Sequence, residues 1–287
     1  MHRRTWPAPW LAAVAALVLT GVLAGPAHAE PAPQGVDRAT GWYLALGDSL
    51  AAGYQPDRGD DPTGGYVGGV LDAVRAATPK TTLVNIACSG ETAVTMVEGG
   101  RCAYEEGTQL AQALEFLGAH GRFTRVVTID IGANDVQRCV SRDPVAIDLP
   151  CVQRGLADVQ RILPAVLAQL RAAAPGARVV VANYYNPFLA AYLTGPAGQA
   201  LAAQSAVLQA TLNAVIGAAA AAAGAEVADV ATAFRSTDTT PVTVPGLGTV
   251  PRNVATICAW TWMCTRNDIH ANDTGYAVMA TAVVARL

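Results

Sequence analysis

Short, almost continuous apolar runs recur along this chain and alternate with segments whose apolar residues have helical spacing. Apolar runs of five or six residues, bounded by turn residues, are typical of strands buried on both faces. The expected strands cover residues 42–46, 82–87, 126–131, 178–182 and 226–230. The expected helices cover residues 66–77, 110–117, 152–173, 199–223 and 273–286. This alternation predicts a three-layer α/β/α sandwich around a mainly parallel, five-stranded sheet.

Small polar segments follow two of these strands, at the sheet edge where parallel sheets bind their ligands. Gly47-Asp48-Ser49-Leu50 ends the first run, and Gly132-Ala133-Asn134-Asp135 ends the third. A histidine segment, residues 268–276, lies near the C-terminus. Ester hydrolysis needs a nucleophile, a base and oxyanion donors, which these segments could supply. Taken alone, Ser49 also fits a helix N-cap, which is a common place for a serine.

In this order and spacing, the three segments resemble the SGNH (GDSL-type) esterase and lipase family, including its secreted actinobacterial members, over roughly residues 42–286. The resemblance makes Ser49 the nucleophile and His270 the base. It implies an oxyanion hole formed by the N–H groups of Ser49 and Gly90 and by the side-chain amide of Asn134. It also implies a flavodoxin-like fold that hydrolyses acyl esters through an acyl-enzyme, with no metal or cofactor.

The acid of the expected triad departs from the family pattern. The usual acid lies three residues before the histidine, and Asn267 occupies that position here. Asp268 lies two residues before His270. Either Asp268 reaches the histidine Nδ1 and fixes its tautomer, or a backbone carbonyl near Asn267 orients the ring in a Ser–His dyad. We favour Asp268 as the third catalytic residue, and we expect Asp48 and Asp135 to brace their own loops.

The six cysteines form three groups of near neighbours along the chain. An even number of cysteines in an exported chain is typical of disulfides. The grouping favours the pairs Cys88–Cys102, Cys139–Cys151 and Cys258–Cys264. Each pair would brace a loop near the expected site. A zinc site formed by Cys258, Cys264 and His270 is the alternative, but its spacing matches no standard zinc pattern.

The first 29 residues have the pattern of a secretory signal peptide. Arg3 and Arg4 precede an apolar stretch over residues 11–24, and Ala27-His28-Ala29 provides a small-x-small cleavage site. The apolar stretch is short for a membrane span. We therefore expect a secreted protein with no stable membrane anchor. Residues 30–41 would form a flexible lead-in, and residues 42–287 the hydrolase domain.

Charge and composition limit the partners of the chain. The net charge is −3, it would become −5 on loss of Arg3 and Arg4, and Lys80 is the only lysine. No basic patch points to nucleic acid. The expected partner is a small-molecule or lipid ester, and a monomer is expected.

Two alternative functions use the same fold. A carbohydrate acetylesterase would place Trp260, Trp262 and Tyr66 as aromatic platforms at the mouth of a short polar groove, although the tryptophans also suit packing against the Cys258–Cys264 loop. A secreted binding protein without catalysis is the second alternative. The stretch 236–256, rich in Thr, Pro and Gly, is expected to be a surface loop that forms one wall of the groove.

Overall fold

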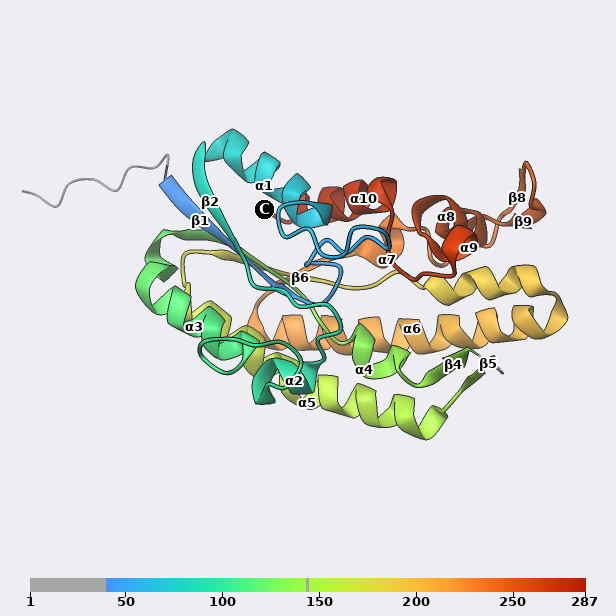
Figure 1. Ribbon diagram of the computed structural model, residues 1–287, viewed down its shortest axis with the longest axis horizontal. Coiled ribbons are helices and arrows are strands. Elements are labelled where there is room, and N and C mark those ends of the chain that lie inside the picture. Colours follow the sequence, from blue (N-terminus) through green and yellow to red (C-terminus); the bar gives the residue numbers. More distant parts are fainter. Residues whose placement is uncertain (1–39, 143–144) are drawn as a thin grey trace, which may run out of the picture. The chain divides into compact units, whose positions relative to one another are not determined.

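The computed structural model describes residues 40–142 and 145–287. Its centre is a five-stranded sheet with the order β2-β1-β3-β6-β7, in which every neighbouring pair is parallel (Figure 1). The strands are β1 (Thr40–Gly47), β2 (Lys80–Asn85), β3 (Thr124–Asp130), β6 (Arg178–Ala182) and β7 (Glu226–Ala228). This is the strand order of flavodoxin-like sheets. The predicted α/β fold is confirmed.

The signal peptide predicted over residues 1–29 lies outside the described residues, as do residues 30–39 of the predicted lead-in. The first strand begins at Thr40, two residues before its predicted start.

Helices cover both faces of the sheet (Figure 1). On one face, α1 (Gly65–Ala77) packs against α10 (Asp273–Val284). The other face carries α3 (Gln109–His120), α5 (Leu149–Ala173) and α6 (Pro196–Ala223). Helix α5 begins three residues earlier than predicted because the Asp148 carboxylate caps it, accepting a hydrogen bond from the Cys151 N–H.

The core lies between the sheet and these helices. The central strands β1 and β3 are buried along almost their whole length. Helix α5 presents an apolar stripe with spacings of three and four residues, the pattern of a helix that covers a sheet. The stripe contains Val159, Ile162, Leu163, Val166 and Leu170.

Shorter elements connect the strands of the sheet and the long helices. They are α2 (Ala93–Glu98), η1 (Gly121–Phe123), α4 (Ala133–Gln137), β4 (Val140–Arg142), β5 (Val145–Ile147), η2 (Pro187–Thr194), α7 (Val230–Ala233), β8 (Pro241–Val244), β9 (Gly248–Pro251), α8 (Arg252–Trp260) and α9 (Met263–Arg266). The prediction of a surface loop over residues 236–256 was wrong in part, because this stretch contains the antiparallel hairpin β8–β9 and the start of α8.

Three disulfides join the cysteine pairs that the sequence grouping favours. Cys88–Cys102 closes the loop after β2, Cys139–Cys151 ties the start of β4 to the first turn of α5, and Cys258–Cys264 joins α8 to α9. Closing loops of this length typically stabilises a fold by about 2–4 kcal/mol.

Among residues 40–142 and 145–287, α6 is the one helix long and apolar enough to cross a membrane. A helix that covers the sheet of an α/β protein can also be this long and this apolar. Here α6 packs against α5 and η2, and its outer face consists largely of alanine.

Candidate active site

Ser49 lies in a tight turn directly after β1. Gly47 has a φ of +132°, and a Cβ atom there would come within 2.3 Å of the Asp130 carbonyl oxygen, so the position requires glycine. The Asp48 N–H donates to that same carbonyl at 3.1 Å. The turn is thereby held against the end of β3, and Ser49 is only 8% exposed.

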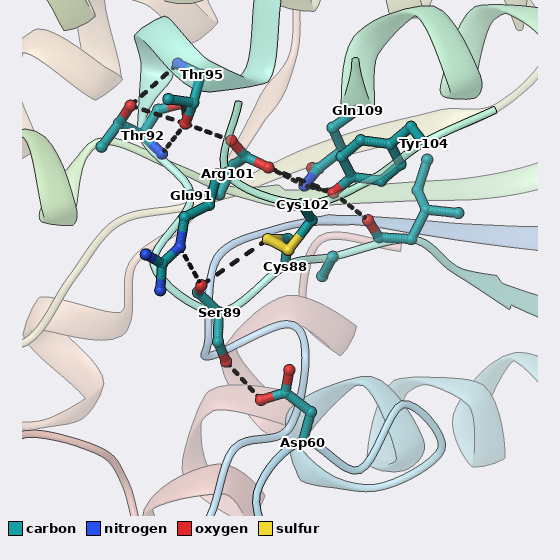
Figure 2. Close-up of a disulfide and its surroundings, with 12 residues drawn as sticks. Asp60, Cys88, Ser89, Glu91, Thr92, Thr95, Arg101, Cys102, Tyr104 and Gln109 are labelled. Atoms are coloured by element: carbon teal, nitrogen blue, oxygen red, sulfur yellow. Dashed lines mark hydrogen bonds between the residues drawn. A yellow bond between two sulfur atoms is a disulfide. The ribbon is translucent and has the colours of Figure 1, made fainter. Parts of the chain in front are cut away.

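Gln109 clamps this turn from the first residue of α3. Its Oε1 accepts from the Gly47 N–H at 2.7 Å, and its Nε2 donates to the Gly47 carbonyl at 3.0 Å. Its Nε2 also contacts the Tyr104 hydroxyl at 2.9 Å and the Glu91 carboxyl at 3.2 Å (Figure 2). The Cys88–Cys102 disulfide lies beside this network. The Gln109 amide therefore satisfies both backbone groups of Gly47 in the core.

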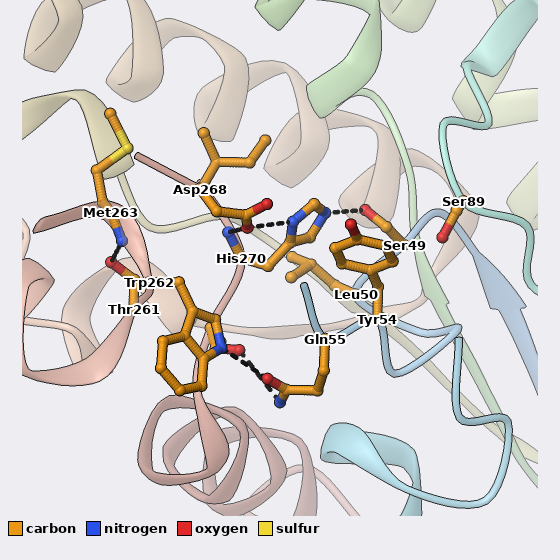
Figure 3. A network of polar contacts seen from close by, with 12 residues as sticks. Ser49, Leu50, Tyr54, Gln55, Ser89, Thr261, Trp262, Met263, Asp268 and His270 are labelled. Atoms are coloured by element: carbon orange, nitrogen blue, oxygen red, sulfur yellow. Dashed lines mark hydrogen bonds and ion pairs between the residues drawn. The ribbon is translucent and has the colours of Figure 1, made fainter. Parts of the chain in front are cut away.

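His270 lies between Ser49 and Asp268 (Figure 3). Its Nε2 is 2.7 Å from the Ser49 Oγ, and its Nδ1 is 2.7 Å from the Asp268 Oδ1. A carboxylate can only accept, so Nδ1 carries the proton and Nε2 is left free to accept the serine proton. The structure brings the three predicted triad residues together, although Asp268 lies one residue nearer to the histidine in sequence than the usual acid does.

The local backbone explains this short spacing. Asn267 adopts a left-handed conformation, with φ +52°, which asparagine tolerates better than most residues. The His270 carbonyl then accepts from the Trp262 N–H at 3.0 Å, and the Tyr185 hydroxyl donates to the Ile269 carbonyl at 2.8 Å. These two hydrogen bonds hold the backbone of the histidine loop in place.

Asn134 lines the same cavity as Ser49 and His270. It lies in the first turn of α4, and its Nδ2 donates to the Glu91 carbonyl at 2.9 Å. An amide nitrogen has two hydrogens, so the second is available to a ligand in the cavity.

Gly90 lies in the loop after β2, the neighbour of β1. The Cys88 N–H donates to the Gly47 carbonyl at 3.0 Å, which brings this loop alongside the Ser49 turn. Gly90 has a φ of +85°, and the Arg101 guanidinium fills the space that a Cβ would need. Gly90 is not among the described residues that line the cavity, so its oxyanion role stays a prediction.

Two buried carboxyls lie beneath the nucleophile turn. Asp48 accepts from the Tyr184 hydroxyl at 2.8 Å, and Asp130 accepts from the Tyr66 hydroxyl at 2.8 Å. Burial raises the pKa of Asp130 well above its usual range, and the neighbouring Asp48 adds to this effect. Burial also raises the pKa of Asp48. The raised pKa favours the protonated form of Asp130.

Asp135 braces a neighbouring element. Its Oδ2 accepts from the Ala93 N–H, the first residue of α2, at 2.9 Å. Burial raises the pKa of Asp135 to about 6.

The other residues considered from sequence are occupied elsewhere. Tyr66 is fully buried. Trp260 packs edge-on against Phe234, whereas Trp262 donates to Gln55 and lies under the Arg266 guanidinium. None of the three is an open platform for a sugar.

A second histidine and the alternative zinc site were also considered. His120 packs against Trp42, near the opposite end of β1 from Ser49. Cys258 and Cys264 are bonded to each other, so neither is a thiolate that could hold zinc.

Sequence reasoning missed three supporting residues. Gln109 and Glu91 hold the turn and the Asn134 loop, and the ring of Tyr54 lies 4.4 Å from that of His270. Gln109 and Glu91 are buried polar residues, but no spacing rule marks a single buried polar residue before the fold is known. Tyr54 lies five residues after Ser49, and this closeness in sequence was the one indication that Tyr54 belongs to the site.

Comparison with known proteins identifies the class. The family model described as the GDSL-like lipase/acylhydrolase family matches residues 45–278. The chain belongs to this family and is a carboxylic ester hydrolase. A search of curated protein sequences gave no significant match.

Solved structures share the fold. Phospholipase A1 from Streptomyces albidoflavus NA297 is 21% identical, with 86% of this chain and 99% of that chain covered and a TM-score of 0.56. Lipase Lip_vut3 from a goat rumen metagenome is 18% identical, with coverages of 86% and 97% and a TM-score of 0.54. The α/β hydrolase LAE5 from the metagenome of Lake Arreo, Spain, is 18% identical, with coverages of 86% and 94% and a TM-score of 0.54.

Proposed function

We propose that this protein is a secreted serine esterase or lipase in which Ser49 is the nucleophile, His270 the general base and Asp268 the residue that orients the base. The observation that carries this proposal is the continuous chain of contacts from Ser49 Oγ through both ring nitrogens of His270 to Asp268, each 2.7 Å long. These are hydrogen-bond distances suited to proton transfer.

In the acylation step, Ser49 Oγ attacks the ester carbonyl carbon while its proton moves to His270 Nε2. The carbonyl π electrons move to oxygen and form a tetrahedral oxyanion. As this intermediate collapses, the bond to the alcohol oxygen breaks, and His270 gives its proton to the departing alcohol. Water then attacks the acyl-enzyme by the same route, and the carboxylic acid leaves with Ser49 restored.

The oxyanion needs donors fixed before the reaction begins. We assign this role to the N–H groups of Ser49 and Gly90 and to the Asn134 amide. The contact between Asn134 and the Glu91 carbonyl supports the assignment, because it holds the amide in a single orientation in the cavity. Removal of one such donor typically costs about 2.7–4 kcal/mol in the transition state.

Export is the second part of the proposal. Three disulfides suit an oxidising compartment. Edman sequencing of the protein recovered from the culture medium of an expressing bacterium should begin at Glu30. Retention of the whole product inside the cell, with residues 1–29 still attached, would contradict export.

Hydrolysis of p-nitrophenyl acetate and butyrate tests the chemistry. Ser49→Ala and His270→Ala should each lose at least about a thousandfold in kcat while keeping the wild-type circular dichroism spectrum. Ser89→Ala is the matched control, since Ser89 lies in the neighbouring loop and its hydroxyl bonds to Asp60 (Figure 2). Normal turnover by the Ser49→Ala protein would overturn the proposed mechanism.

A further inference from the structure

A large groove lies beyond the cavity that holds Ser49 and His270. It encloses about 570 Å³ and is lined by residues of β4, η2, the first turns of α6, the β8–β9 turn and α9. This volume falls in the range of roughly 300–1,000 Å³ that small-molecule sites occupy. The cavity at Ser49 encloses only about 20 Å³, which is roughly the room of one water. A substrate larger than the reacting ester group must therefore extend outside it.

Shared lining residues connect this groove to Ser49. Gln137 lines both the cavity at Ser49 and a second cavity of about 30 Å³. Val140 and Phe188 line both that second cavity and the large groove. Pro187, the residue before Phe188, lines the cavity at Ser49 itself. A series of adjoining cavities thus leads from Ser49 to the groove.

The lining of the groove is suited to hydrocarbon. Most of the residues that line it are apolar, and none of the described ones is charged; the polar ones are Ser141, Thr194 and Asn267. Leu193 and Leu247 lie on it and are 38% and 36% exposed. Large apolar side chains left uncovered around a groove are typical of a binding site. A sugar would need polar partners and aromatic platforms, whereas an alkyl chain needs only apolar surface.

Disulfides hold two walls of the groove. Cys139–Cys151 anchors the start of β4, and Cys258–Cys264 fixes α9, with Cys264 itself on the groove. A groove whose walls are already fixed loses little conformational freedom when a ligand enters.

We propose that this groove binds the acyl chain of the substrate, so that the enzyme prefers long-chain acyl esters to acetyl esters. The inference rests on the proposed function, because the acyl chain reaches the groove through the ester bound at Ser49. Each methylene that leaves water for the groove should raise kcat/KM by about fourfold until the groove is filled.

A p-nitrophenyl ester series from acetyl to palmitoyl, present as monomers below micelle formation, tests the proposal. In the wild type kcat/KM should rise with chain length. The double variant Leu193→Ser, Leu247→Ser should lose about tenfold or more on long chains and keep the acetyl rate. Ala197→Trp, at an exposed position on the groove, should fill it and shift the optimum to shorter chains. Leu149→Ser is the matched control, because Leu149 is 42% exposed but does not line the groove.

The outcomes separate the two proposals. Ser49-dependent hydrolysis with no dependence on acyl length, or with the same length profile in the groove variants, would overturn the groove assignment and leave the esterase function standing. A rate that follows the alcohol chain in a series of alkyl acetates, instead of the acyl chain, would also overturn it. Inactivity of the wild type on every ester would contradict the proposed function itself.

Discussion

One carboxylate oxygen of Asp268 accepts two hydrogen bonds from His270, from its backbone N–H at 2.9 Å and from its ring Nδ1 at 2.7 Å. The short loop closes because Asn267 takes the left-handed conformation. With the carboxylate anchored at the backbone of the residue that it orients, two residues of separation are sufficient. The geometry supports Asp268 over a backbone carbonyl as the group that fixes the histidine tautomer.

Asp268→Asn should lower kcat by about 10²–10⁴-fold, because an amide can donate to Nδ1 and so favour the unproductive tautomer. The rate of p-nitrophenyl butyrate hydrolysis measures the effect. Asp273→Asn is the control, since this exposed carboxylate lies three residues after His270 and pairs with Arg58. Near-wild-type turnover of the Asp268→Asn protein would favour a Ser–His dyad.

Gln109→Ala should lower the free energy of unfolding by roughly 1–3 kcal/mol, because the Gly47 N–H would lose its partner inside the core and the Gly47 carbonyl would keep only the Cys88 N–H. Urea denaturation measures the change. Gln160→Ala, on the exposed face of α5, should change stability by less than about 0.5 kcal/mol. Equal stability of the two variants would show that Gln109 does not hold the turn.

The pKa of Asp135 is raised from its ordinary value of 3.8 to about 6, mainly by burial. Its stabilising contribution is therefore complete below about pH 4 and is lost as the pH rises through 6. Between pH 4 and pH 7, the unfolding free energy of the wild type should fall by about 2–3 kcal/mol relative to that of Asp135→Asn. Urea titrations at both pH values measure this difference, and a difference independent of pH would contradict the assignment.

Asp130→Asn should leave stability within about 1 kcal/mol of the wild type at pH 7. The amide replaces a carboxyl whose pKa burial holds well above its usual range, and it still accepts from the Tyr66 hydroxyl. Asp130→Leu, which removes that acceptor, should be much less stable. Thermal unfolding followed by circular dichroism compares the two. A loss of equal size in both variants would show that Asp130 carries a charge in the fold.

The sheet was predictable because buried parallel strands leave continuous apolar runs, as in Val126–Ile131. The hairpins β4–β5 and β8–β9 were not, since strands of three or four residues are too short to show a period. The observed start of a helix differs from the predicted one where a cap residue determines it, as Asp148 does for α5.

The part of the site that belongs to short sequence motifs was predictable, and these motifs indicated Ser49, Asn134 and His270. The choice between Asp268 and a carbonyl depended on the backbone angle of Asn267, which spacing does not encode. The role of Gln109 depends on its contact with Gly47, 62 residues away in sequence, and no local pattern reports such a contact.

Covalent trapping shows whether Ser49 is the nucleophile. The protein should be treated with diethyl p-nitrophenyl phosphate, digested and mapped by mass spectrometry. We expect one diethylphosphoryl group on Ser49, release of one equivalent of p-nitrophenol with loss of esterase activity, and much slower labelling of the His270→Ala protein. Labelling at another residue with Ser49 unmodified, or full inhibition of the Ser49→Ala protein's residual activity at the wild-type rate, would contradict this role of Ser49.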